Sequence, residues 1–135
     1  MDICIKTIPN SEHRPGIAGG DWYFDSEGNL QIRVSKMSDE RYELALGLHE
    51  MVEAILCRAA GITVAMVDKS DMDMIKKYPD NNGLNGGDEP GECYAKQHSF
   101  ATAAERILTA ELGVCWRQYD DELGALKCES GEPNA

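Results

Sequence analysis

The sequence has few positive charges, few aromatic residues and no paired cysteine motif. Its 135 residues include 13 lysines and arginines against 24 aspartates and glutamates, so the formal net charge at pH 7 is −11. Such a charge repels the phosphate backbone and argues against direct nucleic-acid binding. The five cysteines are odd in number and contain no CxxC pair, which fits neither a disulfide framework nor a zinc ribbon. We therefore expect reduced thiols.

Long apolar runs are also missing. The longest apolar stretches are far shorter than the ~20 residues that cross a bilayer, and "MDICIKTIPN" does not have the basic and apolar regions of a secretion signal. We expect a soluble protein of the cytoplasm with no membrane contact. The length and the 42% hydrophobic content fit one domain with one core.

The first third of the chain has the patterns of β-strands. "DICIKTI" alternates and stops at Pro9, which predicts a strand. "DWYFD", the turn "SEGN" and "LQIRVSK" predict a β-hairpin in which Leu30, Ile32 and Val34 share one face. We expect a small N-terminal antiparallel sheet.

Helical patterns follow. Ser38 is a candidate cap for a long helix that ends at Gly61, and Thr63 for a shorter helix that reaches about residue 78. Residues 80–92 are polar and glycine-rich, which predicts a mobile acidic loop. A third helix is expected over about 94–112, and a short fourth helix follows it. The predicted fold is α+β, with a small sheet packed on two long helices, a single domain over 1–127 and a flexible tail over 128–135.

The long helix contains polar residues on an otherwise apolar pattern, in "ALGLHEMVEAILCRAAG". At 100° per residue, His49 points into the apolar face, and Glu53 lies about 40° from it, one turn further on. Glu50 lies about 100° round the helix, toward the side that we expect to be exposed. This is the spacing of an HExxH zinc helix, in which the glutamate after the first histidine acts as the general base. Here Glu53 replaces the second histidine.

A third ligand is needed for a catalytic zinc site, and His98 is the candidate. It lies in "YAKQHSFATAAERILTAEL", on a face that also carries packing residues. His49, Glu53 and His98 would then form a His₂Glu set for Zn²⁺. Glu105 lies two turns beyond His98, too far to join the same ion, and is a candidate for orienting a ligand or anchoring the helix.

Simpler interpretations stay open. The HExxE motif is short enough to occur by chance. Glu53 could be solvated and His98 could donate to a carbonyl group, in which case these polar residues would stabilise the fold and bind no metal. His13 is expected to be an exposed loop residue. Residues 68–79 lack the glycine and glutamate of an EF-hand, and we expect their aspartates to form a solvated helix face. The aromatics near residues 22–24 and Trp116 are expected to pack the core or the hairpin.

Two segments carry a family resemblance: "LQIRVSKMSDERYELALGLHEMVEAILCRAAGI" and "YAKQHSFATAAERILTAELGVCW". They resemble a group of small uncharacterised proteins of tailed bacteriophages and prophages, over about 21–119. A strand, an HExx helix and a second helix with a ligand are also similar to a minimal zincin metallopeptidase. The phage resemblance implies an origin, and therefore the host cytoplasm as location.

The zincin resemblance implies roles for individual residues. His49 would be a zinc ligand, Glu50 the general base, and Glu53 would occupy the place of the second histidine. His98 would stand where the gluzincin branch has a glutamate. The histidine and the glutamate are thus exchanged between helices, and such exchanges can retain zinc while abolishing peptidase activity.

The sequence thus favours a zinc-dependent hydrolase of metallopeptidase type that acts on a peptide or protein. The strand "LQIRVSK" would pair with an extended substrate, as zincin edge strands do. The rival hypothesis is a non-enzymatic acidic phage accessory protein that binds a host protein, for example by imitating DNA toward a DNA-binding factor. A third hypothesis retains the metal only as a structural element.

Overall fold

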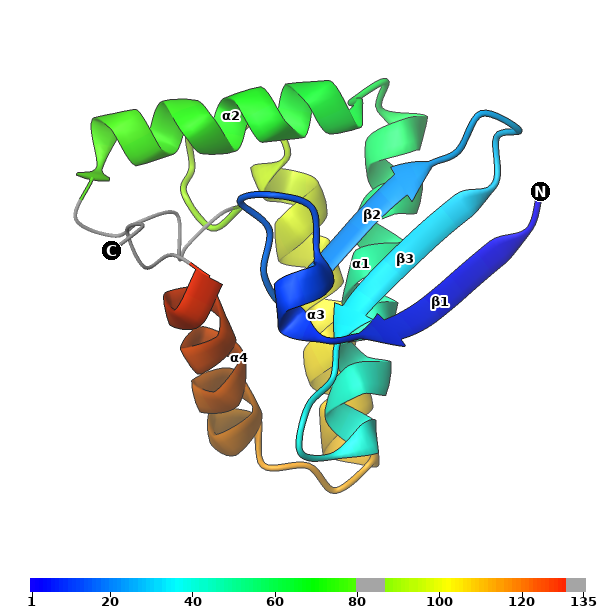
Figure 1. The fold of residues 1–135 in the computed structure, drawn as a ribbon, viewed down its shortest axis with the longest axis vertical. Helices are drawn as coiled ribbons and strands as arrows, with labels where there is room; N and C mark the ends of the chain where they lie inside the picture. Colours follow the sequence, from blue (N-terminus) through cyan, green and yellow to red (C-terminus); the bar gives the residue numbers. More distant parts are fainter. Residues whose placement is uncertain (80–86, 131–135) are drawn as a thin grey trace.

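A three-stranded sheet forms one layer of the protein. The computed structural model describes residues 1–79 and 87–130, and in them the strands are β1 (Ile3–Ile8), β2 (Gly20–Phe24) and β3 (Leu30–Ser35). A 3₁₀ turn over Asn10–Glu12 follows β1. The strand order is β1-β3-β2, as Figure 1 shows. The predicted α+β class, first strand and hairpin are confirmed.

Two expectations about the sheet were wrong. β2 is antiparallel to β3, but β1 pairs with β3 in parallel, so the sheet is mixed. The segment between β1 and β2 carries the chain past the position that β3 later fills, and alternation within a strand does not reveal such a crossing. Since β3 is paired on both sides, it cannot take up a substrate strand.

The inner face of the sheet is set by β3. Leu30, Ile32 and Val34 are fully or almost fully buried, as their shared face predicted. The hairpin turn is closed by Asp25, whose carboxylate accepts the backbone N–H groups of Glu27 and Asn29. The outer face carries polar side chains because alternate residues point to opposite sides of a strand.

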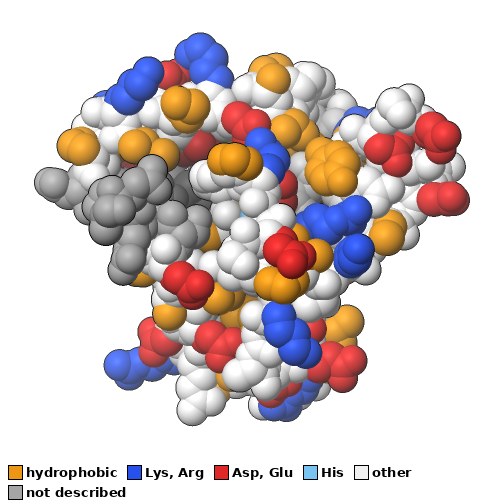
Figure 2. All heavy atoms as spheres, in the orientation of Figure 1, with side chains coloured by type: hydrophobic (Ala, Val, Ile, Leu, Met, Phe, Trp, Pro, Cys, Tyr) orange, Lys and Arg blue, Asp and Glu red, His pale blue; other side chains and the backbone are white. Residues whose placement is uncertain are grey.

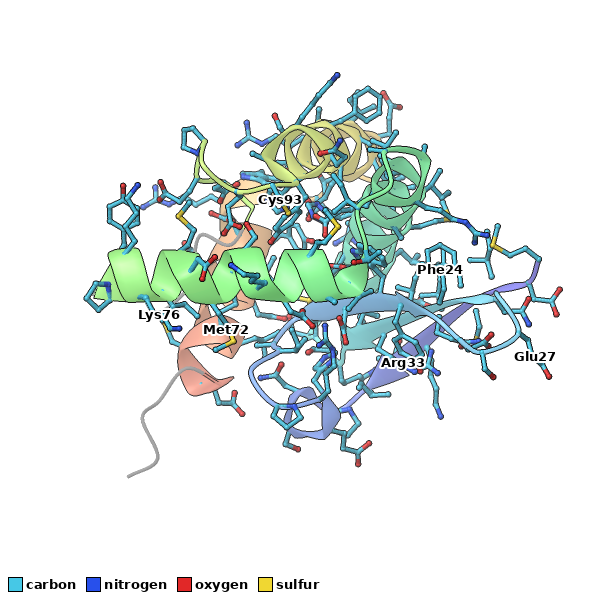
Figure 3. All side chains as sticks on the ribbon, turned by 90° about the horizontal axis from the view of Figure 1, so that it is seen from above. Phe24, Glu27, Arg33, Met72, Lys76 and Cys93 are labelled. Carbon is cyan, nitrogen blue, oxygen red and sulfur yellow. The ribbon has the colours of Figure 1, made fainter. Side chains whose placement is uncertain are left out.

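The described residues form four helices, of which α1 packs directly on the inner face of the sheet: α1 (Glu40–Ala59), α2 (Val64–Lys77), α3 (Ala95–Glu111) and α4 (Trp116–Ser130). α1 contacts β2 and β3 on one side and α3 on the other. The view from above in Figure 3 shows these layers, with Arg33 pointing away from the helices. α1 is therefore buried on two sides.

The C-terminal end of α1 agrees with the prediction. Its N-cap lies one residue later than predicted. Gly61 has a φ of +74°, which suits the residue after a helix. The N-cap is Asp39, whose side chain accepts the N–H of Arg41. Ser38 is not the cap because its N–H donates to Glu122 of α4 at 2.9 Å, and its hydroxyl donates to the same carboxylate.

The remaining boundaries follow the predictions closely. Thr63 caps α2 by accepting the N–H of Met66. α4 is longer than expected and continues through 128–130, which we had assigned to the tail. Residues 131–135 of that tail, and 80–86 of the predicted mobile loop, lie outside the described residues. No described helix is long and apolar enough to cross a membrane.

The burial of Cys57 gives a prediction for thiol reactivity. All five cysteines are free, but Cys57 is fully buried while the others are exposed. Burial, followed by the charge of Glu53, raises the pKa of the Cys57 thiol to about 12. Since the thiolate is the reactive form, the native protein should react quickly with Ellman's reagent at four thiols, and at the fifth only after denaturation. Cys57→Ser should remove that slow fraction, and a fifth rapid thiol in the native protein would contradict the burial.

Candidate metal centre

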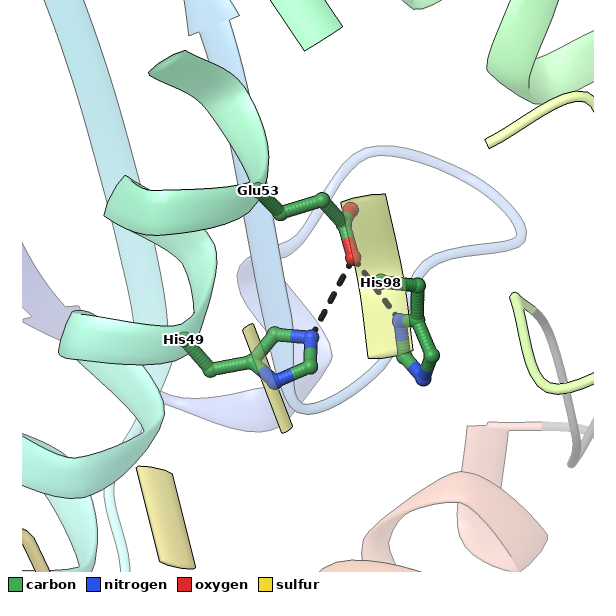
Figure 4. A group of neighbouring side chains, drawn as sticks. All are labelled: His49, Glu53 and His98. Atoms are coloured by element: carbon green, nitrogen blue, oxygen red, sulfur yellow. Dashed lines mark hydrogen bonds and ion pairs between the residues drawn. The ribbon is translucent and has the colours of Figure 1, made fainter. Parts of the chain in front are cut away.

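Three side chains from the two long helices meet beside the sheet. His49 and Glu53 project from α1 and His98 from α3, as Figure 4 shows. Oε2 of Glu53 lies 3.2 Å from Nε2 of His49 and 2.8 Å from Nδ1 of His98. One donor atom from each residue lies within 4.8 Å of the others. The structure therefore brings together the three candidate ligands that the sequence analysis selected.

The second nitrogen of His49 is held by α3. Nδ1 of His49 lies 2.8 Å from Oε1 of Glu105, and the other oxygen of Glu105 accepts the hydroxyl of Tyr119 from α4. Glu105 and Tyr119 are both buried. A carboxylate on one ring nitrogen fixes the tautomer and the orientation of an imidazole, and leaves the other nitrogen for a metal. Glu105 thus orients a candidate ligand, but that residue is His49 of α1 and not His98, its neighbour on α3.

Glu53 and His98 are held in the same way. Nε1 of Trp22, from β2, donates to Oε1 of Glu53 at 2.9 Å, so Oε2 faces the histidines. Nε2 of His98 lies 3.0 Å from Oδ1 of Asp88. Gly87, with a φ of +84°, packs so closely on the His98 ring that a Cβ there would lie 2.5 Å from Cγ. Each of the three residues is therefore fixed at one polar atom, with the other directed to a common point.

This donor set suits a divalent cation. Zn²⁺ binds imidazole nitrogen and carboxylate oxygen at about 2.0–2.2 Å, so tetrahedral ligands lie roughly 3.3 Å apart. The two histidine nitrogens lie 2.8 and 3.2 Å from Oε2 of Glu53, close to that value. The buried carboxylate of Glu53 contacts both imidazoles, and the buried carboxyl groups of Glu50 and Glu105 act on the imidazole of His49. A bound cation would offset this buried negative charge.

The pKa values reflect the same buried charges. Burial alone would lower the pKa of His49, but hydrogen bonds with Glu105 and Glu53 raise it to about 10. Burial alone would raise the pKa of Glu53, but hydrogen bonds with His49 and His98 lower it to about 2. These hydrogen bonds favour the protonated form of His49 and the ionised form of Glu53.

Glu50 is buried, which corrects the expectation that it faces solvent. Its side chain is 9% exposed and lies against Gly20 of β2. Burial, followed by the charge of Glu53, raises the pKa of Glu50 to about 8. The helical wheel was wrong here because α1 packs against both α3 and the sheet, so its buried arc is wider than one apolar face. Glu50 nevertheless lines the same cleft as the three candidate ligands.

The cleft has a volume of about 790 Å³ and lies between α1, α2, α3, α4 and the loop before β2. Its wall includes apolar residues of α2, among them Val67 and Ile75, and polar residues such as Asp71. Asp71 accepts the hydroxyl of Tyr94 at 2.7 Å, so it does not belong to a solvated helix face as expected. Asp68 lies at the rim and pairs with Arg14. The three candidate ligands, His49, Glu53 and His98, thus lie in the wall of this cleft.

Two further expectations concern His13 and Trp22. His13 is not an exposed loop residue, since it is half-buried and its Nε2 lies 2.9 Å from Oγ of Ser35. Trp22 packs in the core as expected, but its indole N–H also orients Glu53. The sequence analysis did not select Tyr119 or Asp88. Neither has a spacing that links it to the HExxE motif, because both contacts depend on how distant segments pack.

Comparisons with known proteins add no family assignment: no family model, no curated protein and no solved structure matches this chain. The bacteriophage and zincin resemblances therefore stay as predictions.

The contact between Gly20 and Glu50 gives a prediction for stability. A Cβ at position 20 would lie 2.4 Å from Oε1 of Glu50, so Gly20→Ala forces the carboxylate or the strand to move. We expect a loss of about 1–3 kcal/mol in the free energy of unfolding, as for other overpacked sites. Gly124→Ala is the matched control, because a Cβ there meets no atom within 4 Å and alanine favours the helix. Urea denaturation measures both, and equal stability of Gly20→Ala and the wild type would contradict this packing.

Proposed function

We propose that the protein is a zinc-dependent hydrolase with His49, Glu53 and His98 as the metal ligands. One observation carries the proposal: each of the three side chains is held at one polar atom by a separate partner, Glu105, Trp22 or Asp88, and directs its other donor atom to the same point. Polar residues that serve only packing need no such common point. The paired atoms resemble the carboxylate–histidine–zinc arrangement of known zinc sites.

The chemistry would use Glu50 and the cleft. When bound, Zn²⁺ supplies Lewis acidity and lowers the pKa of a coordinated water toward about 7. Glu50 lines the cleft directly after a ligand in the chain, and it is the candidate to accept a proton from water and return it to the leaving group. Glu105 and Trp22 keep the ligands in place. With His49, Glu53 and His98 as the protein ligands, a bound ion would still be able to accept water or a substrate carbonyl group.

A zincin-like relationship is part of this proposal. An HExx helix beside a sheet, with a further ligand on the next long helix, is the arrangement expected from the resemblance. The substrate strand would have to pair elsewhere than with β3, which has both edges occupied. A peptide or protein is the proposed substrate class, since the cleft of about 790 Å³ accommodates a side chain together with part of a backbone.

The rival hypothesis of a DNA mimic requires a continuous acidic face. On the described part of the face that Figure 2 shows, Lys and Arg side chains lie among Asp and Glu. This face offers that hypothesis no support, and we place the hydrolase first.

Zinc content tests the proposed ligands. The protein purified without an affinity tag should contain about one zinc per chain by elemental analysis. His98→Ala removes a ligand and should lower zinc affinity by more than the 10–100-fold caused by losing an outer partner of a zinc ligand. His13→Ala is the control, since His13 bonds to Ser35 and does not belong to the cluster. Equal zinc content in His98→Ala and the wild type would reject the site.

The role of Glu50 is tested separately from zinc binding. Glu50→Gln preserves the shape of the side chain and removes no proposed ligand, so the zinc content and the fold should be retained. Turnover of a peptide library should fall by about 10²–10⁴-fold, the usual contribution of a general base. Activity that survives in Glu50→Gln would show that Glu50 is not the base. A zinc-loaded wild type without activity would favour a structural metal.

A further inference from the structure

β1 is an edge strand that exposes apolar side chains. It lies at the outer edge of the sheet in Figure 1, and five of its six residues are exposed. Ile3 and Ile5 are 46% and 50% exposed, although they lie on the face of the sheet that α1 packs against. Ile5 contacts α1 at Gly47, where a Cβ would lie 3.2 Å from its Cγ2. α1 therefore covers this edge incompletely.

The backbone of β1 has a free side. The carbonyl groups of Asp2 and Ile8 accept N–H groups from Leu30 and Lys36 at 2.9 and 2.8 Å, so the even-numbered residues direct their backbone groups to β3. Because the direction alternates along a strand, Ile3, Ile5 and Thr7 direct theirs outward. Within the part of the chain that the structure describes, no strand pairs with this edge. Such an edge is a template for another strand.

We propose that β1 pairs with β1 of a second copy, antiparallel and with Cys4 opposite Cys4. The two sheets would join into one of six strands related by a twofold axis. In this register Ile3 of each copy lies opposite Ile5 of the other, and Asp2 lies opposite Lys6. The strand therefore complements itself in both apolar contacts and charge, without reference to the metal centre.

Charge decides the register. Lys6 pairs in register with Arg33 of β3, so two positive side chains lie side by side on the outer face of the sheet. A lysine on an edge strand usually prevents sheet extension. Here Asp2 of the second copy would lie across from Lys6 and offset that repulsion. A shift by two residues would instead place Cys4 opposite Lys6 and leave both lysines without an acidic partner.

The register places Cys4 at a site that can form a disulfide. Cys4 directs its backbone groups to β3, so the two copies would meet there as a non-hydrogen-bonded pair with Cα atoms about 4.5 Å apart. This distance lies within the range of disulfide bonds. Cys4 is exposed and free in the single chain.

Crosslinking tests the register. In a variant with Cys93, Cys115 and Cys128 changed to Ser, oxidation by diamide should give a disulfide-linked dimer on a non-reducing gel. Cys4→Ser in that background should abolish the dimer. Moving the thiol along the same strand, with Cys4→Ser and Thr7→Cys, is the positional control, because the two Thr7 positions lie several residues apart in this register. Equal crosslinking from both positions would overturn it.

Charge exchange tests the pairing without a disulfide. Sedimentation velocity under reducing conditions should show a dimer that becomes dominant as the protein concentration rises. Asp2→Lys and Lys6→Asp should each weaken dimerisation by about tenfold, and the double exchange should restore it, because Asp2 and Lys6 are exposed and their exchange disturbs no core contact. Circular dichroism confirms that each variant is folded. A wild-type monomer at every concentration, or a double variant that dimerises no better than the single variants, would overturn the proposal.

Discussion

The carboxylate of Glu53 is the point at which three parts of the fold are joined. It accepts the indole N–H of Trp22 from β2 and contacts His49 on its own helix and His98 on α3. A buried carboxylate is costly unless its oxygens are paired, so the sheet and both long helices are constrained to meet at this side chain. The candidate metal centre therefore belongs to the packing of the domain.

The position of α1 between the sheet and α3 explains why so many polar groups are buried on one helix. Each side of α1 packs against a different partner, and the acidic residues Glu43, Glu50 and Glu53 are all buried. Glu43 accepts the backbone N–H of Met37, and Glu53 accepts the indole N–H of Trp22. Among the residues that the structure describes, none donates a comparable hydrogen bond to Glu50, and burial raises the pKa of its carboxyl group. Burial without such a partner distinguishes Glu50 from its neighbours and agrees with a role in proton transfer.

The cleft and the free edge of β1 lie at opposite ends of the strand order β1-β3-β2. Gly20, Asp21 and Trp22 of β2 line the cleft, whereas β1 is separated from it by β3. Association through β1 would therefore leave the cleft open. The proposed hydrolase site and the proposed dimer contact depend on different residues.

The sequence by itself determined the elements and the candidate ligands. Alternation identified β1 and the hairpin, and Thr63 and Gly61 marked helix ends that the structure confirms. The spacing of His49 and Glu53 is a property of any α-helix, so their convergence could be predicted without a fold. His98 followed from the small number of histidines and from the apolar face on which it lies.

Only the tertiary structure decided the surroundings of those residues. The parallel pairing of β1, the burial of Glu50 against Gly20, and the contacts of Glu105 with His49 and Tyr119 all join segments far apart in the chain. Local periodicity shows which side of a helix or strand is apolar, but not which element covers it. A helix that packs on two sides presents a wider buried arc than its sequence indicates, and a strand's partners depend on the path of the chain between them.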